Sequence, residues 1–358
     1  MVNHPPAAAA PATIQVLAPS SLHSANPVVV EVTRGGMVES RHRAAVAVAD
    51  ADGGLVAAWG EVARPIYGRS AIKPLQALPL IETGAADHFA LTPADIALAC
   101  ASHAGEDVHV NAVTAWLGRI GCSIADLECG AHMPRDAGAT ARLIRADTTP
   151  AAAHSNCSGK HTGFLTTARH MGETTAGYIR PDHPVQIRLL AMLEAMTGID
   201  LRAAPRGTDG CGIPVIGIPL AATARAMARL SDPTGLAPVR AVAARRIVAA
   251  MAAHPIMVSG SGEFSLEMMS ALAPTVVLKT GAEGVFAAAL PSRGLGIVLK
   301  VDDGAERASG VVLGAVLRRL GMLTTEQEKS LAALLAPRVC NIAGLEVGQI
   351  RPATGWLA

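Results

Sequence analysis

The first strongly patterned part of the chain consists of short apolar runs separated by glycine-rich turns. Residues 27–32, 44–48 and 55–59 are rich in valine and alanine, and the segments between them include Arg-Gly-Gly (34–36) and Asp-Ala-Asp-Gly-Gly (50–54). Apolar runs on either side of such turns are typical of β-hairpins. We therefore predict an antiparallel meander that ends near Glu61.

The middle of the chain changes to helical periodicity, with stretches that begin near proline or a capping residue and stop at glycine or proline. The helices predicted in this way are 111–120, 182–196, 221–230 and 238–253. Strand character returns at 275–279 and 295–301, and helices are predicted again at 306–320 and 326–335. The pattern thus places strands near both ends and helices between them.

This order of elements predicts an α+β fold. We expect one antiparallel sheet from N- and C-terminal strands, covered by helices, with a helical middle section over roughly 90–255. A parallel doubly wound sheet is the alternative, but it needs a regular alternation of strands and helices. With no repeat or clear linker, 27–358 is predicted to be a single domain, and the Ala-, Pro- and Ser-rich residues 1–26 a disordered or loosely attached tail.

Composition removes several classes of function. Lys+Arg 30 against Asp+Glu 29 gives a net charge of +1, and only 3% of residues are aromatic, so a nucleic-acid partner is not expected. The mean hydropathy of +0.35 comes largely from alanine, and the longest uncharged runs, 210–224 and 247–262, are interrupted by Gly, Pro or His. We therefore expect no membrane span. Residues 1–26 have no positive leader before an apolar run and so do not resemble a signal peptide. The six cysteines lack disulfide-scaffold spacing, and we expect a reducing cytoplasm.

A Ser-x-x-Lys sequence, from Ser70 to Lys73, follows the predicted meander. Residues three apart share a helix face, so the Lys73 amine can come within hydrogen-bond reach of the Ser70 hydroxyl and act as its base. Pro74 disfavours a helical conformation at the residue before it, so the pair is expected where a helix begins and backbone N–H groups are free. Such short sequences also occur on ordinary solvated helices, so the pair needs support from elsewhere.

Two further polar clusters supply that support. Ser102 follows the apolar run 96–101, and Lys279-Thr280-Gly281 ends a predicted strand. The order Ser-x-x-Lys, Ser, Lys-Thr-Gly is that of serine β-lactamases and penicillin-binding proteins. Taken singly, Ser102 could cap a turn and Lys279 could end an ordinary strand.

Two cysteines lie in settings that suit metal binding or nucleophilic attack. Cys157 precedes a predicted helix and has Lys160 and His161 close by, which favours a thiolate. Cys211 lies in a Gly-rich turn after Asp209. Since no CxxC or paired-histidine spacing is present, buried structural cysteines remain the simpler interpretation on these grounds.

Taken together, five segments resemble the class 3 (rhizobial-type) L-asparaginases, a family related to the serine β-lactamase and penicillin-binding protein fold. These segments are 69–76, 101–106, 156–161, 209–214 and 279–285, and the resemblance spans about 27 to 322. It implies a serine β-lactamase-like fold, a homodimer, and hydrolysis of the side-chain amide of L-asparagine.

The resemblance also implies individual roles. The two Ser–Lys pairs are Ser70 with Lys73 and Ser102 with Lys279, and the accessory zinc ligands are Cys157, Lys160 and Cys211. Asp209 is expected to bind the substrate ammonium, with Arg69 and His161 lining the pocket. The predicted mechanism is attack by Ser70 with Lys73 as base, through an acyl-enzyme, with Ser102 and Lys279 relaying the proton to the leaving nitrogen.

Three other functions remain open at this point. The same motifs fit a β-lactamase- or DD-peptidase-like serine hydrolase. Cys157 could instead serve as the nucleophile of a thiol amidohydrolase. The chain could also be a non-catalytic, zinc-dependent binding protein.

Overall fold

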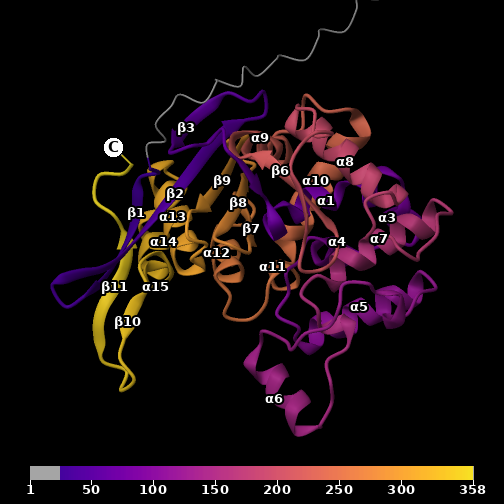
Figure 1. Ribbon diagram of the computed structural model, residues 1–358, viewed down its shortest axis with the longest axis horizontal. Coiled ribbons are helices and arrows are strands. Elements are labelled where there is room, and N and C mark those ends of the chain that lie inside the picture. Colours follow the sequence, from indigo (N-terminus) through magenta and orange to yellow (C-terminus); the bar gives the residue numbers. More distant parts are fainter. Residues whose placement is uncertain (1–24, 358) are drawn as a thin grey trace, which may run out of the picture.

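The computed structural model describes residues 25–357, and its main feature is an antiparallel sheet beside a group of helices (Figure 1). The predicted tail therefore lies outside the described residues except for Ala25 and Asn26. Asn26 is buried: its side chain donates to Asp302 Oδ1 at 2.7 Å and accepts from the Glu61 backbone N–H at 2.7 Å. Asn26, which the prediction placed in the tail, therefore packs against the folded domain.

The large sheet has the order β10-β11-β1-β2-β9-β8-β7, with β3 also paired to β2. Its strands are β1 (Val28–Arg34), β2 (Met37–Asp50), β3 (Leu55–Trp59), β7 (Val277–Gly281), β8 (Val285–Leu290), β9 (Leu295–Val301), β10 (Arg338–Cys340) and β11 (Glu346–Pro352). All its strand pairs are antiparallel. The predicted α+β class and the sheet built from both ends of the chain are confirmed.

The long strand β2 holds the two ends of the chain together. Its first half pairs with β1, and its second half, from Ala44 to Asp50, pairs with β9. β8 is buried at every position, and strands of this kind are covered on both faces. The helices that pack against β8 and β9 are α9 (Leu220–Ser231) and α13 (Glu306–Arg319).

The helical section follows β4 (Pro65–Tyr67) and the 3-10 helix η1 (Arg69–Ile72). It contains α1 (Lys73–Gln76), α2 (Leu78–Glu82), α3 (Ala85–His88), α4 (Pro93–Ala99), α5 (Asp107–Arg119), α6 (Ala137–Arg145), α7 (Ser158–His170), α8 (Pro184–Thr197), α10 (Pro238–Ala253) and α11 (Pro255–Val258). Short 3-10 helices η2 (Ile124–Asp126) and η3 (Ala152–His154) lie between them. A helical middle section is therefore present, beside the large sheet in Figure 1.

Several parts of the fold differ from the prediction. The middle section also holds a three-stranded sheet, β4-β6-β5, formed with β5 (Arg206–Thr208) and β6 (Pro214–Pro219). The last predicted helix is two shorter ones, α14 (Thr325–Ser330) and α15 (Ala332–Leu335), and α12 (Phe264–Leu272) precedes β7. The chain then continues into the β10–β11 hairpin, whose exposed and half-buried residues gave no clear apolar run.

No helix among residues 25–357 is long and apolar enough to cross a membrane.

Candidate active site

Ser102 lies between two lysine side chains. Its Oγ is 3.0 Å from Lys73 Nζ and 2.9 Å from Lys279 Nζ. All three residues are at most 3% exposed. The structure therefore brings together three of the four residues predicted to form two Ser–Lys pairs.

Each member of this cluster comes from a different element. Lys73 is the first residue of α1, Lys279 lies in the edge strand β7, and Ser102 follows α4. The Ser102 segment is held by its backbone, since Ser102 N–H donates to Val258 O at 3.0 Å. Arg135 adds a bond from its Nη2 to Ser102 O at 2.6 Å. Arg135 was not predicted, because nothing near it in the sequence forms a recognisable motif.

Ser70 is placed differently from the expectation. It lies in η1 directly before α1, as Pro74 indicated, and is half-buried. Within residues 25–357, however, its hydroxyl makes no hydrogen bond. Lys73 Nζ is instead directed to Ser102, to Ala101 O at 2.5 Å and to Cys157 Sγ at 3.2 Å. The predicted hydrogen bond between Lys73 and Ser70 is therefore wrong for this state of the protein, because buried acceptors on the other side hold the amine.

Gly281 keeps the Ser70 turn against strand β7. A Cβ added there would lie 2.9 Å from the Ala71 backbone N and 3.1 Å from Gly68 O. Only glycine lets the backbone of β7 pass this close to η1. The Lys-Thr-Gly segment therefore reaches both serines, with Lys279 at Ser102 and Gly281 at the turn that carries Ser70.

Burial sets the charge state of the two lysines. Desolvation lowers the pKa of Lys73, an effect that the nearby Cys157 opposes and Lys160 reinforces. The pKa of Lys279 falls well below its usual value through desolvation and then through the Lys73 and Arg135 charges. Desolvation therefore favours a neutral, proton-accepting amine at both lysines, most strongly at Lys279.

The predicted zinc ligands are brought together beside Lys73. Lys160 Nζ is 3.0 Å from Cys211 Sγ, and Cys157 precedes the first residue of α7. α7 reaches this position because it packs tightly on α4 at Gly159, where a Cβ would lie 2.3 Å from Leu98 O. The three groups are buried and come from two segments far apart in the sequence.

The electrostatics of this group suit a thiolate. The adjacent Cys211 side chain lowers the pKa of Cys157 well below its usual value, against the effect of burial and with help from Lys73 and Lys160. Burial lowers the pKa of Lys160, but the Cys157 thiolate and the neighbouring Cys211 side chain outweigh it and leave that pKa raised. Lys160 must therefore lose a proton before it can bind zinc, and the set of two sulfurs and one amine nitrogen then consists of donor atoms that zinc accepts. No group of three or more His, Cys, Asp or Glu side chains able to hold a metal occurs among the described residues.

Arg69 and Asp209 form an ion pair next to Ser70. Arg69 Nε donates to Asp209 Oδ1 at 2.6 Å, and Cys211 Sγ donates to Oδ2 at 3.3 Å. Burial raises the pKa of Asp209, but Lys160 and Arg69 outweigh it and keep that pKa below its usual value. Arg69 has a φ of 47°, a left-handed conformation that costs an ordinary residue about 1–3 kcal/mol. The ion pair helps to hold this strained residue just before Ser70.

His161 lies beside these groups but has another partner. Its Nδ1 is 2.7 Å from the Tyr178 hydroxyl, a contact that no sequence motif indicated. Burial, Lys160 and Lys73 lower the pKa of His161 well below its usual value, so the ring is neutral.

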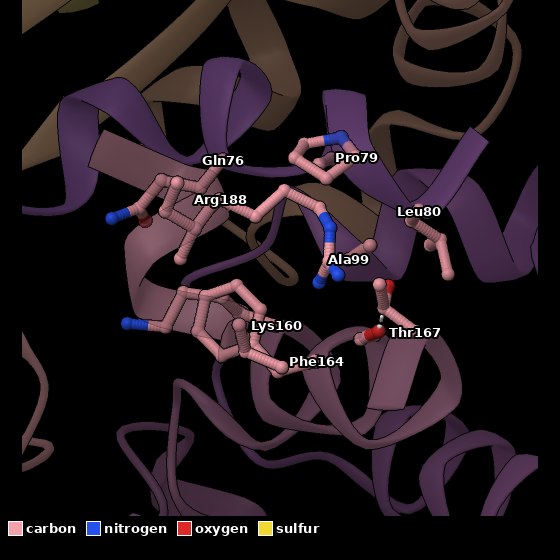
Figure 2. A pocket seen from close by; sticks show the side chains of 12 residues that line it. Gln76, Pro79, Leu80, Ala99, Lys160, Phe164, Thr167 and Arg188 are labelled. Carbon is pink, nitrogen blue, oxygen red and sulfur yellow. Dashed lines mark hydrogen bonds between the residues drawn. The ribbon is translucent and has the colours of Figure 1, made fainter. Parts of the chain in front are cut away.

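Cavities near the site differ greatly in size. The cavity drawn in Figure 2, lined by Lys160, Phe164 and Arg188 among others, holds about 10 Å³, which is room for a single water at most. A groove of about 370 Å³ adjoins the site at Arg69 and is also lined by Glu283 and Lys300. A ligand of amino-acid size therefore finds space on the Arg69 side of the site.

A serine hydroxyl next to buried lysine amines is an arrangement that nucleophilic hydrolases use. The model of the L-asparaginase II family matches residues 30–352. The chain therefore belongs to the L-asparaginase II family and is an amidohydrolase. The match extends past 322, where the predicted resemblance ended.

Solved structures and curated proteins add little to this assignment. The chain is similar to a β-lactamase from Mycobacterium bovis, with 15% identity, 77% of this chain and 94% of that chain covered, and a TM-score of 0.39. It is also similar to a putative β-lactamase from Bacteroides dorei, with 14% identity, 77% and 92% coverage, and a TM-score of 0.42. No curated protein matches the chain.

Proposed function

We propose that the protein hydrolyses the side-chain amide of L-asparagine to L-aspartate and ammonia through an ester on Ser70. The observation that carries the proposal is the cluster in which the Ser102 hydroxyl contacts both Lys73 and Lys279. Family membership supplies the reaction class. The arrangement of the residues then suggests which serine is the nucleophile and which one relays a proton.

Ser70 is the better candidate for the nucleophile because a substrate can reach it. It is half-buried, whereas Ser102 is 3% exposed. Its backbone N–H precedes the first hydrogen bond of η1, from Ala71 N to Gly68 O, and is thus available to an oxyanion. In the proposed reaction Ser70 attacks the amide carbon and its proton passes to Lys73.

Ser102 and Lys279 then act as a proton relay. Lys73 passes the proton through the Ser102 hydroxyl towards the leaving nitrogen. Because the Lys279 amine is neutral, the Ser102 hydroxyl beside it can accept one proton and donate another. Ammonia leaves, and water hydrolyses the ester on Ser70 to release aspartate. For Ser70 to deliver its proton, the Lys73 amine must turn from Ala101 O towards it when the substrate binds.

Asp209 and Arg69 are proposed to hold the amino-acid part of the substrate. The Asp209 carboxylate retains capacity for an ammonium in addition to its bond from Arg69. Arg69 in turn lines the 370 Å³ groove, so it can contact the substrate carboxylate from there.

Zinc binding by Cys157, Lys160 and Cys211 remains a proposal that rests on the donor set and on the resemblance. When bound, zinc would supply a positive charge that helps to place the substrate. A homodimer is proposed on the resemblance alone, and light scattering of the purified protein tests it.

The direct test of function is ammonia release from asparagine, from glutamine and from a chromogenic β-lactam, each with and without added zinc. The proposal expects ammonia from asparagine and no β-lactam turnover. Turnover of the β-lactam without ammonia from asparagine would assign the site to a penicillin-recognising hydrolase. Binding of asparagine by calorimetry without any turnover would instead indicate a binding protein.

A thiol mechanism is separated from the serine mechanism by two variants. Ser70→Ala is expected to abolish ammonia release, and Cys157→Ala to leave turnover measurable. The opposite result, an active Ser70→Ala and an inactive Cys157→Ala, would establish Cys157 as the nucleophile.

A further inference from the structure

Tyr178 is a fully buried residue that contacts His161 at the candidate site. Its hydroxyl is 2.7 Å from His161 Nδ1 and accepts a hydrogen bond from the Glu128 backbone N–H at 2.8 Å. The side chain is 0% exposed, so water does not compete for these bonds. Tyr178 lies outside all the segments that carry the family resemblance.

The two bonds determine where the histidine proton lies. A phenol has one proton, and the backbone N–H of Glu128 can only donate. The Tyr178 proton is therefore used only if it is donated to His161 Nδ1. That nitrogen is then the unprotonated one, and the neutral ring carries its proton on Nε2. The opposite tautomer, and equally a ring protonated on both nitrogens, would leave the buried tyrosine proton without an acceptor.

The other nitrogen of the ring has no partner. His161 Nε2 is buried and makes no hydrogen bond within residues 25–357. His161 directly follows Lys160 in α7, and the Lys160 amine contacts Cys211 at the candidate site. Buried N–H groups are nearly always paired in native proteins. The acceptor for the His161 Nε2–H is therefore expected to be supplied by a ligand.

We infer that Tyr178 is a positioning residue that fixes His161 as the Nε2–H tautomer, so that this N–H donates a hydrogen bond to an oxygen of the bound substrate. The acceptor is a carboxylate or amide oxygen of a small amino-acid amide. The identity of that ligand rests on the proposed function, whereas the tautomer depends only on the contacts of Tyr178.

The tautomer can be measured without any substrate. In protein labelled with ¹⁵N at histidine, long-range proton–nitrogen spectra distinguish the protonated from the unprotonated ring nitrogen. We expect His161 to carry its proton on Nε2 in the wild type and to become a mixture of tautomers in Tyr178→Phe. Tyr67→Phe, which alters the other tyrosine of the chain, is the matched control and is expected to leave the signals unchanged.

A second experiment remains informative if Tyr178→Phe does not fold. A glutamine amide reaches the position of Nε2, whereas an asparagine amide reaches only that of Nδ1. We expect His161→Gln to keep the KM for asparagine within several-fold of the wild type and His161→Asn to raise it at least tenfold, with kcat changed less in both. Tyr178→Phe, where folded, is expected to raise KM several-fold at nearly constant kcat.

Two results would overturn the inference: a proton on Nδ1 of His161 in the wild type, or a His161→Asn variant that binds substrate better than His161→Gln. If the protein released no ammonia from asparagine, the proposed function would fail while the tautomer measurement still stood. The two failures are thus distinguishable.

Discussion

Lys279 Nζ lies 2.9 Å from Ser102 Oγ although the two residues are 177 positions apart in the chain. β7 pairs with β8 and is the last strand in the order of the sheet, so it is an edge strand. From there Lys279 reaches the segment that follows α4. The Lys73 amine contacts the same hydroxyl. The Ser102 hydroxyl therefore lies between the two lysine amines, as the proposed proton relay requires.

Replacing Lys279 with methionine is expected to change how stability depends on pH. The pKa of Lys279 is lowered in the folded protein, so between that pKa and about 10.4 the unfolded chain binds more protons. Stability therefore rises with pH across this window, by up to about 1.4 kcal/mol per pH unit for this one group. In Lys279→Met the free energy of unfolding should lack this contribution to its increase with pH.

The measurement is chemical denaturation of wild type and Lys279→Met from pH 7 to pH 10. The free energy of unfolding of the wild type, minus that of the variant, should increase as the pH increases. Parallel curves over the whole range would contradict a neutral Lys279 in the folded protein.

Gly281→Ala is expected to reduce activity without unfolding the protein. The added Cβ would lie 2.9 Å from the Ala71 backbone N, so either β7 or the Ser70 turn must move. A displacement of about 1 Å at a catalytic group can cost about 10²-fold in rate. Steady-state kinetics would detect it, and Gly118→Ala, where nothing lies within 4 Å of the new Cβ, is the control that should keep full activity.

Asp209→Asn is expected to weaken substrate binding. The variant loses the charge proposed to hold the substrate ammonium and also the partner of the strained Arg69. A charged hydrogen bond is worth about 1.5–3 kcal/mol, so KM for asparagine should rise about 10- to 100-fold. The matched control is Asp200→Asn, which breaks an exposed ion pair with Arg202 of the same 2.6 Å length. An unchanged KM in Asp209→Asn would remove Asp209 from the substrate site.

Metal content tests the proposed zinc ligands. Purified wild-type protein should contain about one zinc per chain, with sulfur and nitrogen donors as zinc prefers. Cys211→Ser should lower the zinc content measured by plasma mass spectrometry, whereas Cys340→Ser, at an exposed free cysteine, should not. Equal zinc in both variants would show that the metal binds elsewhere.

The sequence predicted the elements whose periodicity is strong, such as β9 at Leu295–Val301 and α10 at Pro238–Ala253. It missed β10 and β11, because strands with few buried positions carry no alternating apolar signal. From the order of the motifs it paired Ser102 with Lys279, and the structure contains this contact. It could not predict that Lys73 points to Ser102, since that orientation depends on buried carbonyls such as Ala101 O.

Tyr178 and Arg135 were missed for a related reason. Their contacts, to His161 and to the Ser102 backbone, join segments that no motif connects. A single sequence shows residue types and spacing, whereas hydrogen bonds across the fold appear only when the chain is assembled.

The central claim is that Ser70 carries the acyl group and Ser102 relays the proton. Asparagine can be mixed with the protein, the reaction quenched in acid within the first turnover, and the ester located by mass spectrometry of the peptides. The account predicts a β-aspartyl ester on Ser70 that is absent in Ser70→Ala and still forms, about 10²- to 10⁴-fold more slowly, in Ser102→Ala. An ester on Ser102 or Cys157 in the wild-type protein would contradict it.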